Sequence, residues 1–235
     1  MSSFKEVGLT NGTDKISTHG YHRFYPMYLD QFKEKEGSML EIGVELGYSL
    51  RMWLSYFPTL YLYGIDIHVE GEGDRYKVLR CDQSNKEQLE KICTSIDKPL
   101  YFVVDDGSHV PEHQLLTFEV LFPKVEPGGV YIIEDIETSY WSKGYIYQYK
   151  THYGYKHHRS CVEVFKSVVD DVNRRYMTET NMVTQNSLLS SFISEAVRAQ
   201  IRTVTFAPNC IIITKRTAED DTWNYVKPYH FGDRL

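Results

Sequence analysis

The chain has 235 residues, of which 42% are hydrophobic and 25% are charged, and its formal net charge is −6. This length and composition fit one globular domain with a substantial core. The charge excludes a strongly basic protein, and no stretch concentrates the lysine and arginine that a nucleic-acid partner requires. We therefore expect no nucleic-acid partner.

The apolar runs are short, the longest being residues 100–104 and 130–133, so we expect no membrane-spanning helix and no membrane partner. The first residues carry no apolar signal core, which predicts a cytoplasmic location. The four cysteines are scattered and form no C-x-x-C pair, which indicates reduced thiols.

Short apolar runs alternate with amphipathic stretches, a pattern typical of strands and helices built around a mostly parallel sheet. Strands are predicted at residues 38–43, 60–66, 76–81, 100–105 and 130–134. Helices are predicted at residues 48–57, 86–95, 110–122 and 162–176, whereas 181–194 is ambiguous. Residues 204–206 and 210–214 predict a closing hairpin.

Two polar regions interrupt this pattern. Residues 8–32 predict a mobile N-terminal arm, and residues 138–155 predict a long loop that is too polar for the core. With the strands above, we expect one domain of about seven strands.

Polar residues follow the first three predicted strands, at the sheet edge where open α/β sheets bind ligands. Gly43 and Gly47 would let the backbone approach a ligand closely, but their spacing is not that of a dinucleotide-binding loop. A carboxylate at Asp66 could accept the hydroxyls of a ribose, and Asp82 with Gln83 could contact an adenine. The alternative is that Asp66 and Asp82 cap the helices that follow them.

A second group of acids follows the fourth and fifth strands. Asp105 and Asp106 precede His109, and Glu134 and Asp135 end the next strand. These side chains should converge, and because grouped carboxylates repel one another, a divalent cation would stabilise them. Ligation by oxygen alone favours Mg²⁺ or Mn²⁺ over zinc. Singly, His109 could instead cap a helix, and the acids could belong to a tight turn or a solvated strand end.

Taken together, the glycine turn and the strand-end acids resemble the S-adenosylmethionine site of class I methyltransferases. More narrowly, the sequence resembles the metal-dependent O-methyltransferases that act on sugars, of the macrocin and mycinamicin type. The matching motifs are Gly12-Thr-Asp-Lys15, His19-Gly-Tyr21, Leu40-Glu-Ile-Gly43, Asp82-Gln-Ser84, Asp105-Asp-Gly-Ser-His109, Pro127-Gly-Gly-Val-Tyr-Ile-Ile-Glu-Asp135 and Thr138-Ser-Tyr-Trp141. The resemblance implies a Rossmann-like α/β fold with a seven-stranded, mostly parallel sheet, an antiparallel last strand, and helices on both faces.

The resemblance also implies roles for individual residues. Asp106, Glu134 and Asp135 match the metal ligands, His109 matches the general base, and Asp105 is expected on the cofactor side. The residues expected at the cofactor are Thr13, Lys15, His19, Tyr25, Gly43, Glu45, Ser49, Asp66, Asp82, Gln83 and Asp105. Lys15 or Tyr25 would lie near the cofactor's carboxylate, unless the N-terminal segment is only a loose surface arm.

The resemblance divides the single domain, residues 1–235, into four segments. These are an N-terminal arm or lid (1–37), a cofactor and metal core (38–141), a substrate loop with helices (142–200), and a closing hairpin with a tail (201–235). No family pattern is recognisable from residue 142 onward, so the acceptor pocket is undefined at this stage.

The expected activity is a Mg²⁺-dependent transfer of a methyl group from S-adenosylmethionine to a hydroxyl of a deoxysugar such as rhamnose. The expected partner is a sugar-containing small molecule or a glycan. Two alternatives stay open: a metal-dependent methyltransferase of catechol-like aromatic diols, and a non-catalytic nucleotide-binding module. An NAD-linked oxidoreductase is disfavoured because the glycine fingerprint is absent.

Overall fold

The structure is a computed structural model that describes residues 2–141, 153–173 and 192–222. Its centre is an eight-stranded sheet in the order β3-β4-β2-β1-β5-β6-β8-β7. The strands are β1 (Gly37–Ile42), β2 (Leu60–Asp66), β3 (Gly71–Gly73), β4 (Tyr76–Arg80), β5 (Leu100–Asp105), β6 (Val125–Glu134), β7 (Ile201–Ala207) and β8 (Cys210–Lys215). The five predicted strands and the closing hairpin are confirmed.

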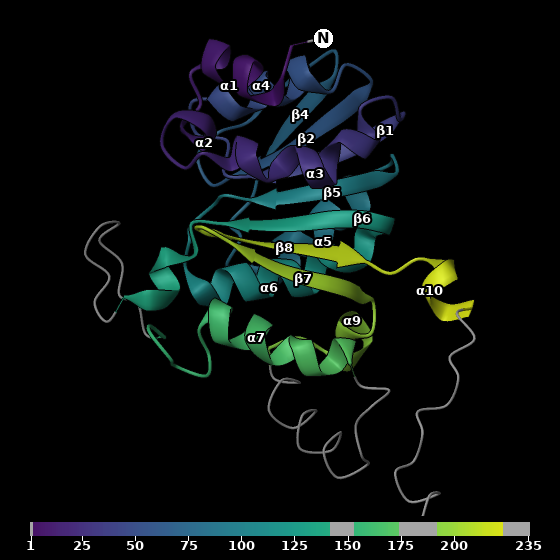
Figure 1. The fold of residues 1–235 in the computed structure, drawn as a ribbon. Helices are drawn as coiled ribbons and strands as arrows, with labels where there is room; N and C mark the ends of the chain where they lie inside the picture. The colour runs from purple at the N-terminus through teal and green to yellow at the C-terminus, as the bar shows by residue number, and fades with distance from the viewer. Residues whose placement is uncertain (1, 142–152, 174–191, 223–235) are drawn as a thin grey trace, which may run out of the picture.

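Strands β4, β2, β1, β5 and β6 pair in parallel, whereas β8 runs antiparallel to both of its neighbours, β6 and β7. In Figure 1, β5 and β6 point one way and β8 points the other. The predicted insertion of one antiparallel strand near the end of the chain is therefore confirmed. The sheet has one strand more than predicted because the short β3 pairs with the edge of β4.

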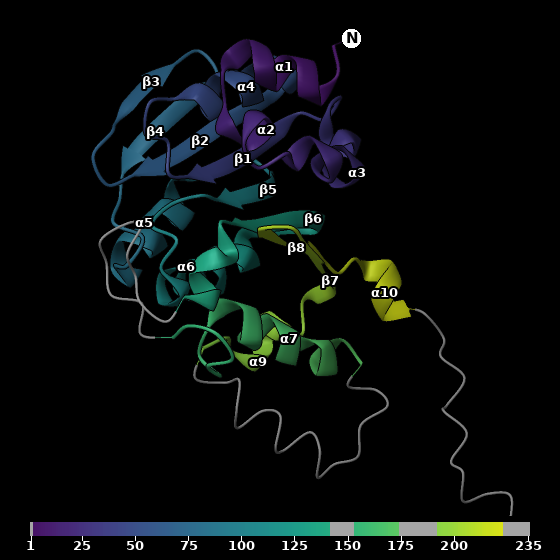
Figure 2. The ribbon, with the colours of Figure 1, turned by 60° about the vertical axis from the view of Figure 1, so that its left-hand side comes forward.

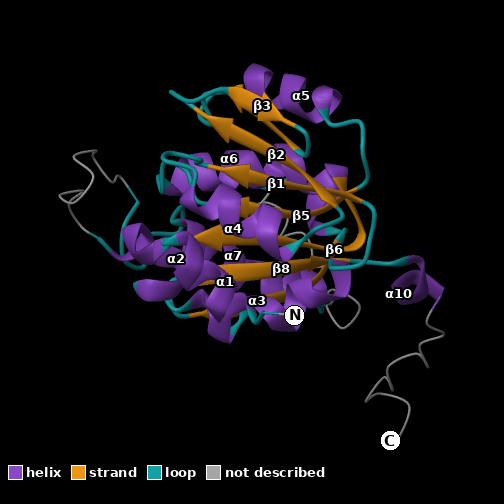
Figure 3. Ribbon diagram, turned by 90° about the horizontal axis from the view of Figure 1, so that it is seen from above, coloured by secondary structure: helices purple, strands orange, loops and turns teal. Residues whose placement is uncertain are grey.

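Helices cover both faces of the sheet. They are α1 (Phe4–Asn11), α2 (Asp14–Ser17), α3 (Tyr25–Leu29), α4 (Tyr48–Tyr56), α5 (Lys86–Ser95), α6 (Pro111–Leu121), α7 (Cys161–Val172), α9 (Glu195–Arg198) and α10 (Ala218–Thr222), with 3₁₀ turns η1 (Tyr21–Arg23), η2 (Asp30–Phe32), η3 (Phe122–Lys124) and η4 (Ile136–Tyr140). Figure 2 shows α1 to α4 on one side of the sheet and α5, α6 and α7 on the other. Helix α10 stands apart from this body (Figure 3).

The strand sequences fill both faces because successive side chains point to opposite sides. In β6, Tyr131 and Ile133 join the core cluster formed with α5, α6 and α7, whereas Val130 and Ile132 join the cluster formed with α1 to α4. All four are fully buried. A run of apolar residues without alternation is what a central strand covered on both faces requires.

Capping side chains set the helix starts. Ser3 and Glu6 form a capping box at α1, Asn85 caps α5, and Ser160 caps α7. The four predicted helices are confirmed, and α5 has the bounds predicted for it. Helix α7 ends at Val172, and part of its predicted continuation, 174–176, lies outside the described residues.

The expectation of a mobile N-terminal arm is wrong. Residues 8–32 form short helices packed on the sheet, and the side chains of Tyr21, Tyr25, Leu29 and Phe32 are at most 1% exposed. Tyr25 and Phe32 stack against aromatic residues of the sheet and of α4. The segment is part of the core.

Replacing Phe32 by alanine is therefore expected to lower the free energy of unfolding by about 3–5 kcal/mol, as for a buried aromatic side chain. Urea denaturation measures the change. Met27→Ala is the matched control, because Met27 lies in the same segment and is 78% exposed. If the free energy of unfolding falls as little for Phe32→Ala as for the control, the segment would be a mobile arm after all.

The region expected to be a long polar loop begins differently. Residues 136–140 form η4, in which Thr138 and Ser139 are buried, so its start belongs to the core. Most of the remaining predicted loop (142–152), most of the ambiguous stretch (181–191) and the tail from 223 lie outside the described residues. Across the described ranges, the helices are too short or too polar to cross a bilayer.

Candidate active site

The carboxyl ends of the parallel strands surround a cavity of about 980 Å³. It lies where the strand order reverses between β1 and β5, which is where open α/β sheets bind ligands. The predicted site residues that line it are Thr13, His19, Gly43, Glu45, Ser49, Asp66, Asp82, Gln83, Asp106, His109 and Asp135. This volume is at the upper end of the range for small-molecule sites.

The turn after β1 makes a close backbone approach that only glycine permits. Gly43 has a φ of +83°, and a Cβ there would lie 2.1 Å from the carbonyl oxygen of Asp106. The absence of a side chain therefore lets the loops after β1 and β5 touch beside the cavity, which both loops line.

Replacing Gly43 by alanine is expected to lower the free energy of unfolding by about 2–4 kcal/mol and to displace Asp106. Gly71→Ala is the control, because nothing lies within 4 Å of a Cβ at Gly71, and it should change stability by about 0.5 kcal/mol or less. Thermal unfolding of both variants measures the difference. Equal stabilities would contradict the close approach.

The backbone at the rim of the cavity is strained. Glu45, His109 and Asp135 all have positive φ, at 47°, 57° and 53°, in the left-handed region that residues other than glycine rarely adopt. All three line the cavity. Such strain concentrates at functional sites, where it fixes the direction of a side chain.

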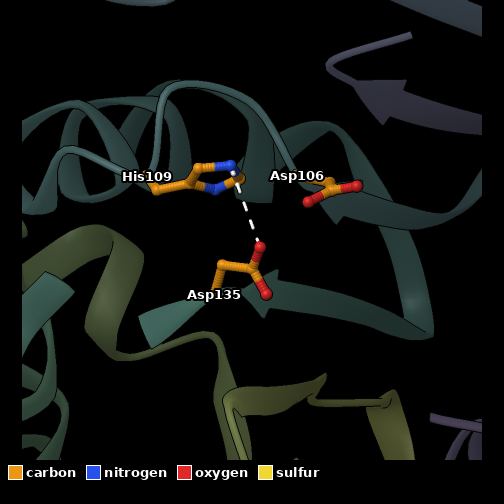
Figure 4. A group of neighbouring side chains, drawn as sticks. All are labelled: Asp106, His109 and Asp135. Atoms are coloured by element: carbon orange, nitrogen blue, oxygen red, sulfur yellow. Dashed lines mark ion pairs between the residues drawn. The ribbon is translucent and has the colours of Figure 1, made fainter. Parts of the chain in front are cut away.

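Asp106, His109 and Asp135 converge at this rim, as Figure 4 shows. Each offers one ligand atom, and these atoms lie within 4.8 Å of one another. The closest imidazole contact joins His109 Nε2 to Asp135 Oδ2 at 3.9 Å. Oxygen ligands bind Mg²⁺ or Ca²⁺ at about 2.0–2.6 Å, so the oxygens of Asp106 and Asp135 fit a single divalent cation, with His109 beside it.

Asp135 is held by residues far from it in sequence. Its Oδ1 accepts hydrogen bonds from Tyr21 Oη (3.0 Å) and Asn209 Nδ2 (2.8 Å) and lies 3.5 Å from His19 Nδ1. Burial and the negative charge of Asp106 raise the pKa of its carboxyl. Repulsion between the two acids contributes to this rise after burial, and a bound cation would relieve it.

A second group of charges lies beneath the rim. Lys15 Nζ contacts Asp106 Oδ2 at 2.5 Å and Glu134 Oε2 at 2.6 Å, and Tyr25 Oη donates to Glu134 Oε1. Burial raises the pKa of Glu134 well above its usual range, even though Lys15 opposes this shift. The ammonium of Lys15 therefore compensates the buried acids.

Three of the residues expected at the cofactor lie outside the lining of the cavity. Lys15, Tyr25 and Asp105 do not line the cavity. Lys15 and Tyr25 face Glu134, as described above, and Asp105 is fully buried between Gln83 Nε2 (3.1 Å) and Tyr131 Oη (3.5 Å). Burial raises the pKa of Asp105 to about 7. Sequence order placed all three near the site but could not show which way their side chains point.

Glu134, expected among the metal ligands, also does not line the cavity and is 1% exposed. Its two oxygens face Lys15 and Tyr25. Its role as a third ligand stays a prediction from the resemblance.

The two strand-end acids of the nucleotide side line the cavity and also accept hydrogen bonds from backbone amides of the neighbouring loops. Asp66 accepts hydrogen bonds from four backbone amides, those of Val44, Glu45, His68 and Val69. These bonds lower the pKa of Asp66 although burial opposes them. Ser84 similarly holds Asp82 and lowers its pKa. Their cavity position is observed, but the capping interpretation is not confirmed, because strand β3 follows Asp66 and Asn85 is the N-cap of α5.

Asn209 was not predicted as a site residue. Its Nδ2 donates a hydrogen bond to Asp135, and its Oδ1 accepts one from the backbone amide of Glu137. It lies in the turn between β7 and β8. Because β8 pairs antiparallel with β6, this turn comes to the carboxyl end of β6, where Asp135 lies. The predicted hairpin, combined with that pairing, was the signal that could have identified it.

Comparisons with known proteins find sugar O-methyltransferases that are similar to this chain. The chain is 37% identical over 145 residues to the 8-demethyl-8-alpha-L-rhamnosyl tetracenomycin-C 2'-O-methyltransferase of Streptomyces olivaceus, covering 57% of this chain and 38% of that protein. It is 38% identical over 133 residues to the mycinamicin VI 2''-O-methyltransferase of Micromonospora griseorubida, covering 52% and 33%. No family model matches the chain.

Among solved structures, the MycE methyltransferase of the mycinamycin biosynthetic pathway, in complex with Mg, S-adenosylhomocysteine and mycinamycin VI, superposes with a TM-score of 0.78 at 26% identity. The match covers 93% of this chain and 55% of MycE. The chain thus spans about half of MycE, and its aligned part covers about a third of the two curated relatives.

The strand order and the superposition on MycE show that the chain has the class I S-adenosylmethionine-dependent methyltransferase fold. Within that class, the chain is similar to sugar O-methyltransferases of the mycinamicin type over the aligned parts given above.

Proposed function

We propose that this chain transfers a methyl group from S-adenosylmethionine to a hydroxyl of a deoxysugar carried by a glycosylated natural product, with help from Mg²⁺ or Mn²⁺. The observation that carries the proposal is the convergence of Asp106, His109 and Asp135 at the rim of the large cavity. A cofactor-binding module without chemistry would have no use for an imidazole beside two acids.

The residues divide the work by position. Gly43, Glu45, Asp66 and Asp82 line the part of the cavity next to the ends of β1, β2 and β4, where S-adenosylmethionine would bind. Asp106 and Asp135 would hold the cation, with Glu134 beneath them as the predicted third ligand. Positive charge supplied by such a cation favours loss of a proton from a nearby hydroxyl.

His109 takes that proton. A free sugar hydroxyl is a poor nucleophile near neutral pH, and an imidazole is the side chain best suited to remove its proton there. The sugar oxygen then forms a bond to the methyl carbon as the bond from that carbon to sulfur breaks. The products are the methoxy sugar, S-adenosylhomocysteine and a proton on His109. The protein contributes mainly the alignment of the two reactants.

Relatives named above methylate rhamnosyl and mycinamicin substrates, and these names favour a sugar over an aromatic diol as the acceptor. Mass spectrometry of rhamnosides and other unmethylated glycosides, incubated with S-adenosylmethionine and Mg²⁺, tests the proposal. We expect a mass gain of one methylene on a glycoside, abolished by EDTA and restored by Mg²⁺ or Mn²⁺. Methylation of a catechol alone, or activity that EDTA leaves unchanged, would contradict it.

A further inference from the structure

Lys15 is a buried lysine whose ammonium lies among carboxylates at or just after the ends of three different strands. Its side chain is 1% exposed. Its Nζ lies 2.5 Å from Asp106 Oδ2, 2.6 Å from Glu134 Oε2 and 3.7 Å from Glu41 Oε1. One short helix of four residues, α2, thus reaches the ends of β1, β5 and β6.

The surrounding hydrogen bonds fix the acids on the inner side. Tyr25 holds the second oxygen of Glu134, and Trp53 and Ser49 hold Glu41. Asp106 differs from these two acids because its side chain is 24% exposed and lines the cavity. Lys15 therefore binds Oδ2 of Asp106 from the side away from the cavity, while the Asp106 carboxylate borders the cavity.

Without Lys15, two acids would face each other without compensation. Glu134 is almost fully buried, and both it and Asp106 contact the same ammonium. Like charges at this distance repel, so the pair would separate or reorient. Asp106 is the member with room to move, because it borders the cavity.

We propose that Lys15 is a positioning residue, whose ammonium holds Asp106 and Glu134 so that Asp106 stays beside His109 and Asp135. The inference rests on the proposed function and deepens it. Lys15 does not line the cavity, so it acts through the acids and not on substrate. It also ties the N-terminal segment, whose Thr13 and His19 line the cavity, to the strand ends.

Metal affinity separates this role from a purely electrostatic one, because the two roles predict opposite changes in cation affinity when Lys15 is replaced. Removing a positive charge next to a cation site strengthens cation binding if the geometry is unchanged. Removing a positioning contact weakens it, because the ligand leaves its place. Loss of second-sphere partners of metal ligands typically weakens binding by about 10–100-fold.

The test is Mn²⁺ binding to the full chain, followed by electron paramagnetic resonance, for wild type and Lys15→Met. We expect the dissociation constant of the variant to rise by about tenfold or more. An unchanged or lower constant would overturn the proposal. A lower melting temperature with unchanged Mn²⁺ affinity would show that Lys15 serves stability alone, and would overturn it equally.

Lys215→Met is the matched control. Lys215 is also buried, but its Nζ donates to the carbonyl oxygens of Phe122, Pro123 and Val125. Within the described residues it donates to no acid, so its loss should leave Mn²⁺ affinity unchanged. If Lys15→Met does not fold, Lys15→Gln is held to the same tenfold criterion. Failure of the wild type to bind Mn²⁺ would contradict the proposed metal site itself. If the wild type and the Lys15 variant bind Mn²⁺ equally tightly, only this inference is contradicted.

Discussion

Replacing His109 by alanine is expected to lower methyl-transfer turnover by about 10²–10⁴-fold, the usual contribution of a general base. The reason is that His109 lies at the cavity rim, 3.9 Å from Asp135, where it can accept the proton of a hydroxyl. The affinity for S-adenosylmethionine should change little, because the cofactor side of the cavity is formed by other residues. Steady-state turnover and calorimetric titration of the cofactor measure the two effects.

His22→Ala is the control for this variant. His22 belongs to η1 in the N-terminal segment and does not line the cavity, so its loss should leave turnover within a fewfold of wild type. Near-normal turnover of His109→Ala would place the base elsewhere. A parallel loss of cofactor affinity would indicate a binding role for the imidazole instead.

Replacing Asp135 by asparagine is expected to weaken Mn²⁺ binding by at least about 100-fold, since even outer-sphere partners of metal ligands contribute about 10–100-fold. The change removes one charge but keeps the shape of the side chain. Tyr21 and Asn209, which hold Oδ1, are left in place. Turnover should fall with metal affinity, and raised Mn²⁺ concentrations should recover part of it.

Asp82→Asn provides the comparison. It removes an acid from the same cavity. Asp82 is hydrogen-bonded to Ser84 and does not belong to the group formed by Asp106, His109 and Asp135. Its Mn²⁺ affinity should equal that of wild type. Equal affinities for Asp135→Asn and wild type would remove Asp135 from the set of ligands.

The sheet could be predicted because its signals are local. Residues 60–66 and 100–105 are apolar runs ended by an acid, and both strands have the predicted bounds. Since parallel strands end at one edge, the convergence of Asp106, His109 and Asp135 followed from the order of the strands. The edge strand β3 could not be predicted, because Gly71–Gly73 is exposed and has no strand-forming side chain.

The N-terminal segment could not be predicted, because its contacts are distant in sequence. Helix α2 has four residues, too few to show a helical period, and Lys15 meets Asp106 and Glu134 at separations of 91 and 119 residues. The segment was expected to be a mobile arm, yet Asp135 and Glu134 accept hydrogen bonds from the hydroxyls of Tyr21 and Tyr25 within the core. A polar pattern of this kind is typical of either a loose arm or a buried network.

The most direct test is a crystal structure of the chain with Mn²⁺ and S-adenosylhomocysteine, in which anomalous scattering locates the ion. We expect one strong peak within about 2–2.3 Å of oxygens from both Asp106 and Asp135, with the adenosyl group in the adjoining cavity and His109 beside the ion. A peak elsewhere, or none at saturating Mn²⁺, would contradict a metal-assisted methyl transfer at this site.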